Sequence, residues 1–196
     1  MWKTVSYWAI VALSVIGGLH PAEAQVKILT VCEVLSDVDH DADTAVAIVG
    51  RVERSVSLID HYEFLSQDHC EHPVIIHGHT WSNRIQILGW EEGMPRPPVN
   101  NPRLAQPVIA AKLAAVRETT ELGSHQVPGF TKDGHVTYVT VPNEWAVVYG
   151  RIVKSPSLDD DCGAGGCGGD DVPLIVIAIQ ARGLKDDGTP LPANDF

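Results

Sequence analysis

The sequence lacks the short motifs that identify several common classes of enzyme. It contains no GxSxG nucleophile elbow, no P-loop, no HExxH pair and no two CxxC pairs of zinc ligands. Elbow-type serine hydrolases, P-loop NTPases and HExxH metalloproteases are therefore not indicated. We predict no catalytic residues. A small hydrolase, the third hypothesis, would require scattered Ser, His and Asp residues to meet in space.

Positive charge is also scarce. Lys and Arg number 14 against 25 for Asp and Glu, which gives a formal net charge of −11 at pH 7. A phosphate backbone and an anionic lipid surface both repel a protein of this charge. The composition therefore predicts that nucleic acid is not a partner.

The first 24 residues have the pattern of a secretory signal peptide. A cationic start with Lys3 precedes the apolar run WAIVALSVIGGL, and Ala22 and Ala24 form an A-x-A cleavage pattern before Gln25. The run is too short for a membrane-spanning helix, so an uncleaved anchor is the weaker interpretation. No later stretch approaches a membrane span. We expect residues 25–196 to form one soluble domain, secreted or periplasmic, with no membrane insertion after cleavage.

Four cysteines follow the signal peptide, and an exported protein favours disulfides over free thiols. Cys162 and Cys167 stand in CGAGGC, a glycine-rich loop whose ends meet easily. Pairing these two leaves Cys32 with Cys70. We therefore predict both disulfides, out of the three pairings that four cysteines allow.

The order of predicted elements is strand, strand, strand, helix, strand, strand. Thr30 with Glu33 forms a capping box for a short helix at 30–37, and the main helix is expected over Pro107–Leu122, with Ile109, Leu113 and Val116 as its apolar stripe. The first two strands are expected at 45–56 and 62–67. The third is expected at 73–81, and it is either extended into 83–90 or broken before it. The last two strands are expected at 135–155 and 172–185.

This order predicts a mainly β protein, an OB-fold-like five-stranded barrel with one capping helix between strands three and four. A generic α+β sandwich is the alternative. Ala45–Ser55 and Trp145–Ser155 share a Gly-Arg pair in register. In an OB-fold strands one and four pair, so these two segments should be neighbours. Their mid-strand glycines predict strongly bent strands.

The arrangement resembles a group of uncharacterised exported bacterial proteins with OB-like barrels. The matching residues are Val31, Cys32, Glu33, Val34 and Leu35, then Val49, Gly50 and Val52, then Cys70. They cover roughly the first half of the chain after the signal peptide. The resemblance implies an OB-like fold and an exported location, and it carries over no activity and no catalytic residues.

The leading functional hypothesis is a non-catalytic exported module that binds a protein, peptide or small ligand. Barrels of this type use aromatic side chains on strands two and three, and Tyr62, Phe64 and Trp81 occupy such positions. Five basic residues either form one patch or are ordinary outward charges: Arg51, Arg54, Arg84, Arg151 and Lys154.

The segment His61–His79 supports the alternative hypothesis, a metal-binding protein. It holds five histidines and a cysteine. His77 and His79 alternate in the sequence, so we expect both to project from one face of a strand, and histidines so placed can bind zinc or copper. A disulfide at Cys70 would leave a site of His69, His72, His77 and His79. The simpler interpretation is a half-exposed strand and turn, and no other cofactor is predicted.

The loop 158–171 carries aspartates on both sides of a glycine-rich centre. Carboxylates and backbone carbonyls are calcium ligands, but the spacing is not that of an EF-hand. We favour a solvated hairpin loop closed by its own disulfide.

Overall fold

The structure is a computed structural model that describes most of the chain after the predicted signal peptide. The described residues are 26–41, 43–56, 61–76, 78–94, 102–121, 124–130, 132–133, 135–158 and 172–192. The predicted signal peptide therefore lies outside the described residues, as do Cys162, Cys167 and all of the aspartate- and glycine-rich loop except Leu158.

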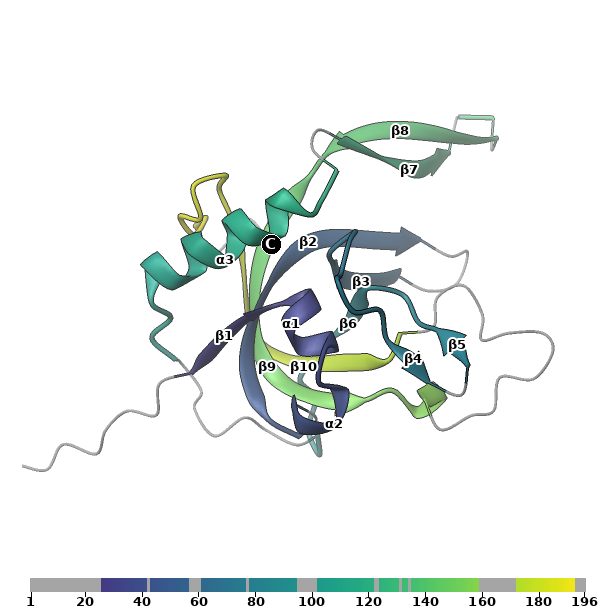
Figure 1. Cartoon of the computed structure of the whole chain (residues 1–196). Coiled ribbons are helices and arrows are strands. Elements are labelled where there is room, and N and C mark those ends of the chain that lie inside the picture. The colour runs from purple at the N-terminus through teal and green to yellow at the C-terminus, as the bar shows by residue number, and fades with distance from the viewer. Residues whose placement is uncertain are drawn as a thin grey trace, which may run out of the picture.

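The chain is mainly β (Figure 1). Its strands are β1 Lys27–Thr30, β2 Ala45–Val56, β3 His61–Ser66, β4 Ile75–Ile76, β5 His79–Thr80, β6 Arg84–Gly89, β7 Ser124–Phe130, β8 Val136–Pro142, β9 Glu144–Lys154 and β10 Leu174–Leu184. Its helices are α1 Val31–Leu35, α2 Val38–Asp41, α3 Gln106–Glu118 and the 3₁₀ turn Pro156–Leu158. Within the residues described, no helix is long and apolar enough to cross a membrane.

Five strands close into a barrel in the order β2–β3–β6–β10–β9, and β9 pairs back onto β2. The pairing of β6 with β10 is parallel, and the other four pairings of the barrel are antiparallel. Helix α3 lies between the third barrel strand, β6, and the fourth, β9. This is the OB-like barrel that the sequence predicts, and the prediction is confirmed.

The two Gly-Arg strands are neighbours, as predicted. Strands β2 and β9 run antiparallel with Ile48 opposite Val148, so each glycine lies two residues from this centre. A Cβ atom on Gly150 would lie 2.3 Å from the carbonyl oxygen of Ile177, and one on Gly50 would lie 2.8 Å from Val31 Cγ2. Both glycines are therefore required by close approach of neighbouring atoms in a tightly coiled barrel.

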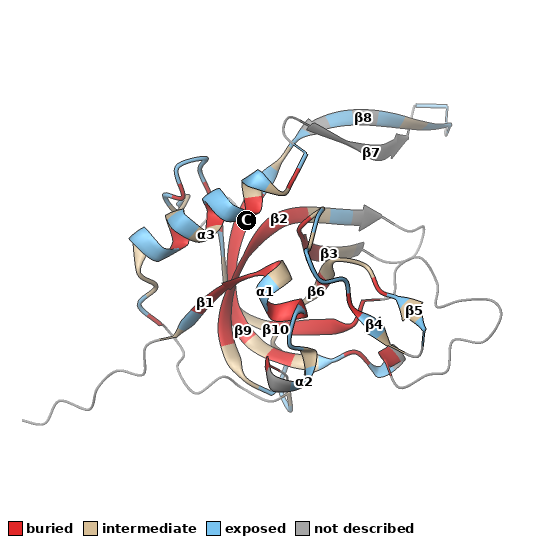
Figure 2. Ribbon diagram, viewed as in Figure 1, coloured by how far each residue is buried: buried red, intermediate tan, exposed pale blue. Residues whose placement is uncertain are grey.

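Helix α1, rather than α3, contributes to the core inside the barrel. Val31, Val34 and Leu35 are buried in the same cluster as the inward-facing strand residues, such as Ile48 and Leu65. Figure 2 shows this helix lying across the ring of strands, with part of its ribbon coloured as buried. The Thr30–Glu33 capping box that starts the helix is present as predicted.

Helix α3 covers the outer wall of the barrel. Its predicted stripe of Ile109, Leu113 and Val116 is buried against Val49 and Tyr149, which face outward from β2 and β9. The helix ends at Glu118, before the predicted Leu122: Thr119 leaves the helical conformation with φ −106° and ψ 2°, and its backbone N–H donates to the Val116 carbonyl oxygen at 3.2 Å.

Three elements differ from the sequence prediction. Strand β1 pairs in parallel with the first half of β2, α2 is a single helical turn for which no element was predicted, and β7 and β8 form a separate two-stranded sheet. Elements β1, α2 and β7 are short or irregular in sequence, so local periodicity does not reveal them, whereas β8 is the first part of the strand predicted over 135–155. The β7–β8 hairpin is an insertion between α3 and β9.

Candidate functional site

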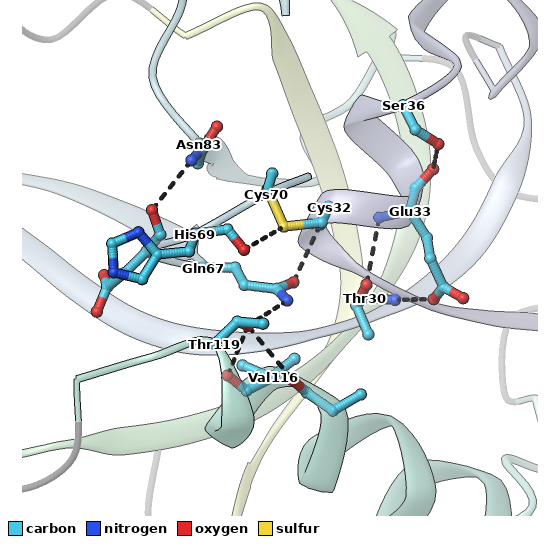
Figure 3. Close-up of a disulfide and its surroundings, with 12 residues drawn as sticks. Thr30, Cys32, Glu33, Ser36, Gln67, His69, Cys70, Asn83, Val116 and Thr119 are labelled. Carbon is cyan, nitrogen blue, oxygen red and sulfur yellow. Dashed lines mark hydrogen bonds between the residues drawn. A yellow bond between two sulfur atoms is a disulfide. The ribbon is translucent and has the colours of Figure 1, made fainter. Parts of the chain in front are cut away.

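The histidine-rich segment begins as barrel strand β3 and is then fixed covalently to helix α1. Cys70 forms the predicted disulfide with Cys32, with their Cα atoms 5.3 Å apart (Figure 3). The bond joins the short helix to the segment that follows β3. Its cysteine is thereby unavailable as a thiolate ligand for a metal.

Gln67 links the same segment to two helices. Its Oε1 accepts from the backbone N–H of Cys32 at 3.1 Å, and its Nε2 donates to Thr119 Oγ1 at 2.7 Å (Figure 3). The His69 backbone N–H donates to the Thr119 carbonyl oxygen at 3.2 Å. The segment Gln67–Cys70 therefore holds α1 and the C-terminal end of α3 beside the barrel.

A charged pair ties this segment to the barrel wall. Asp68 accepts two hydrogen bonds from the Arg51 guanidinium, at 3.0 and 2.6 Å, and one from the Glu121 backbone N–H at 3.0 Å. Arg51 is buried and also contacts Glu53. Such bidentate geometry is strong and directional, so it fixes the turn after β3.

The candidate metal-binding histidines do not all lie on one strand. Strand β4 ends at Ile76, Gly78 has a φ of +77°, and β5 begins at His79, which pairs with Ile76 across a tight hairpin. Ile76 and His79 therefore lie on opposite strands of a hairpin, so the single strand expected through this segment is not formed.

His69 and His72 are exposed, and the ring of His79 packs edge-on against Trp81 with centroids 5.3 Å apart. In the part of the chain that the structure describes, no three His, Cys, Asp or Glu side chains gather as metal ligands. His77 lies outside the described residues, so the four-histidine site stays a prediction.

The three aromatic residues predicted as a ligand-binding surface differ in accessibility. Tyr62 is half-buried, whereas Phe64 is 1% exposed and Trp81 is 3% exposed. Phe64 packs against Val172 and Ile175 under the Arg84 guanidinium, and Trp81 belongs to the barrel core. Neither buried ring is accessible to a ligand in this structure. A sequence pattern identifies an aromatic residue but not what covers it.

The five basic residues that the sequence left open are all matched by carboxylates. Arg54 of β2 bonds to Glu63 at 3.1 Å and to Glu144 at 2.6 Å. Partial burial opposes its charge, but these hydrogen bonds together raise the pKa of Arg54. The other ion pairs join Arg51 to Glu53 and Asp68, Arg84 to Glu53, Arg151 to Asp43, and Lys154 to Asp39.

A cleft of about 350 Å³ lies between the start of α3 and the second half of β10. We refer to it as the α3–β10 cleft. Ile109 and Val147 are buried at its apolar floor, and Arg103 and Arg182 are exposed at it. Among the described residues, its lining is Pro102, Arg103, Leu104, Gln106, Ile109, Val147, Gln180, Arg182 and Pro190.

The described residues that line the α3–β10 cleft supply two guanidinium groups and two amides, and none of them carries a carboxylate. A neighbouring cleft at the start of β9 includes Glu144 and Asp186, and one beside the exposed face of α3 includes Glu118, Asp186 and Asp187. Of these three clefts, the α3–β10 cleft is the one whose described lining carries positive but no negative side chains, in a chain with a net charge of −11.

Two local interactions fix the polar groups of this cleft. When the Gln180 amide is oriented with its oxygen toward Arg182, this oxygen accepts from Arg182 Nε and Nη2, each at 2.8 Å. Gln106 Nε2 donates to the carbonyl oxygen of Gly188, which connects the start of α3 to the turn after β10. The bond to Gln180 restrains the Arg182 guanidinium and leaves it further N–H donors.

Sequence reasoning did not find this site, because its residues come from four separate segments. Comparison with known proteins adds nothing to the geometry: no protein-family model, curated protein or solved structure matches this chain.

Proposed function

We propose that this protein is an exported, non-catalytic binding module whose α3–β10 cleft holds a small organic acid with one carboxylate and an apolar body. The observation that carries the proposal is the described cleft lining, which combines Arg103 and Arg182 with an aliphatic floor and includes no acidic side chain among those residues. The two parts of the lining match the two parts of such a ligand.

The guanidinium groups select the charged part of the ligand. Arginine presents a planar fork of N–H donors that matches a carboxylate, and charge-assisted hydrogen bonds are stronger than neutral ones. The net charge of −11 raises the cost of bringing a second negative charge to the protein. A monoanion is therefore favoured over a phosphate monoester of the same size.

The size and floor of the cleft select the remainder of the ligand. Its volume of about 350 Å³ is at the lower end of the roughly 300–1,000 Å³ typical of small-molecule sites. Leu104, Ile109 and Val147 supply an apolar surface that contributes roughly 25 cal/mol for each Å² removed from water. A medium-length aliphatic acid satisfies both conditions.

Two further observations support the exported, binding-module part of the proposal. The Cys32–Cys70 disulfide is the type of bond that persists in oxidising compartments. The five basic residues on β2, β6 and β9 are paired with carboxylates, which neutralise the positive charges that would be required to bind nucleic-acid phosphates. We therefore propose that nucleic acid is not a partner.

Calorimetric titration of the purified protein with octanoate tests the proposal. We expect saturable binding at one site, and Arg182→Gln and Arg103→Gln should each weaken it about tenfold or more, since each removes a charge-assisted hydrogen bond. Lys132→Gln is the matched control: it removes the same charge from an exposed residue of the β7–β8 turn, outside the cleft. The affinity of the Lys132→Gln variant for octanoate should equal that of the wild type.

Two related compounds separate the contributions of the charge and the chain. Octan-1-ol has the same apolar body without the charge, and octyl phosphate carries more negative charge, so both should bind more weakly than octanoate. Octanoate binding that is absent, or that survives loss of both arginines, would overturn the proposal.

A further inference from the structure

The β7–β8 hairpin stands apart from the rest of the molecule. Figures 1 and 2 show it projecting beyond the barrel wall, with exposed positions along β8. Val136 is 60% exposed and Tyr138 is 66% exposed, while Thr140 and Pro142 of the same strand are also exposed. Large apolar side chains are thus presented on an element that makes a sheet of only two strands.

The two strands of the hairpin are also distinguished by their lack of charged residues, since Lys132 and Asp133 lie in the turn between them. Among the described strands of four or more residues, only β7 and β8 contain no Asp, Glu, Lys or Arg. The other strands of this length each carry at least one, as β2 does with Arg51, Glu53 and Arg54. A neutral ribbon in a chain of net charge −11 is the element on which close approach of another acidic protein costs least.

The two edges of the hairpin are unequal. In the described part of the chain, β7 and β8 pair only with each other. Pro128 in β7 has no backbone N–H, which interrupts any ladder on that strand. The stretch Val136–Val141 of β8 contains no proline, glycine or charged residue, and it therefore lacks the features that keep an edge strand from pairing.

We propose that β8 pairs antiparallel with β8 of a second copy of this chain and that the two hairpins form one four-stranded sheet. A two-fold axis brings residues near it next to their own counterparts, so any charge there would meet a like charge. A different partner protein would impose no such condition. The uncharged strand therefore fits a second copy in particular.

The position of the hairpin agrees with this arrangement. Each copy carries a net charge of −11, so two copies repel one another wherever their acidic surfaces approach. A projecting, neutral hairpin lets two chains join while the barrels stay apart. A contact of this size belongs to the small, weak class of interfaces, so the dimer should form reversibly at micromolar or higher concentration.

Sedimentation equilibrium of the purified full chain across a wide concentration range tests the inference. We expect a monomer–dimer equilibrium whose dissociation constant rises at least about tenfold in Tyr138→Glu, because each β8 then brings a carboxylate into the contact between the two strands. Thr140→Glu serves as a second variant on the same strand. Val108→Glu adds the same charge at an exposed residue of α3 and should leave the equilibrium unchanged.

Hydrogen exchange supplies the residue-level readout. The amides of Val136–Val141 should become more protected at high protein concentration in the wild type and not in Tyr138→Glu. A protein that stays monomeric at all concentrations overturns the inference. So does a dimer unaffected by both strand variants, since its contact would lie on another surface.

Discussion

Two regions beside the barrel are attached to it in different ways. The segment Gln67–Cys70 is connected by a disulfide, by a bidentate ion pair and by side-chain hydrogen bonds to two helices. The β7–β8 hairpin has its own backbone pairing, and Val136 and Tyr138 on β8 extend into solvent. The first region stabilises the fold, whereas the second is a surface that folding leaves accessible. Substitutions should therefore change stability in the first region and association in the second.

Removing the Cys32–Cys70 disulfide should have the largest effect on stability. The bond closes a loop with a sequence separation of 38, for which the chain-entropy model gives about 4 kcal/mol. The double variant Cys32→Ala, Cys70→Ala should lose roughly that free energy of unfolding, measured by urea denaturation. A loss below about 1 kcal/mol would mean that hydrogen bonds alone hold α1 in place.

Breaking the ion pair between Asp68 and Arg51 should have the next largest effect. Asp68→Ala leaves the buried Arg51 without its bidentate partner and the Glu121 amide without an acceptor, which should cost about 2 kcal/mol in unfolding free energy. Asp39→Ala is the control, since its pair with Lys154 is exposed and contributes less than about 0.5 kcal/mol. Equal losses in the two urea titrations would contradict this ranking.

The barrel could be predicted from the sequence because its signals are local. The β-branched runs around Gly50 and Gly150 identify bent strands, and the stripe of Ile109, Leu113 and Val116 identifies the helix between them. The order of these elements then restricts the topology. The Cys32–Cys70 bond followed from the loop-local position of the other two cysteines.

The hairpin and the α3–β10 cleft could not be predicted, for two different reasons. Strand β7 contains Pro128 and Gly129, which disfavour a strand, and it exists by pairing with β8. In the cleft, Arg103 and Arg182 are far apart in the chain, and only the packing of α3 beside β10 brings them to one site. At Trp81 the sequence identifies an aromatic residue of a type suited to binding, but the fold buries its side chain in the core.

A smaller and pH-dependent effect is expected at Glu33, which accepts from Thr30 and Lys112. Partial burial opposes its ionisation, but the hydrogen bonds from Lys112 and Thr30 outweigh this and lower the pKa of Glu33 below its ordinary value of 4.5. The charge therefore stabilises the fold above pH 4.5, and this stabilisation is lost as the pH falls through the lowered pKa.

Glu33→Gln tests this contribution, because glutamine retains the capping-box hydrogen bond and loses only the charge. The Glu33 side chain is 43% exposed, so solvent screening limits the expected loss to about 0.5 kcal/mol at pH 7. Urea titrations from pH 7 to roughly pH 3 should show the two proteins converging toward acid. A difference that grows as the pH falls would have the wrong sign.

The smallest effect on stability is expected at Tyr138. Its side chain is 66% exposed on β8, so Tyr138→Ser removes little buried area and should change the unfolding free energy by less than about 0.5 kcal/mol. The measurement should be made at a concentration low enough for the protein to be monomeric, because any dimer adds stability by mass action. Repeating it at high concentration should reveal a loss that is absent in the dilute sample. If dilute Tyr138→Ser instead loses more than about 1 kcal/mol, the hairpin is part of the fold's own core and the contrast between the two regions fails.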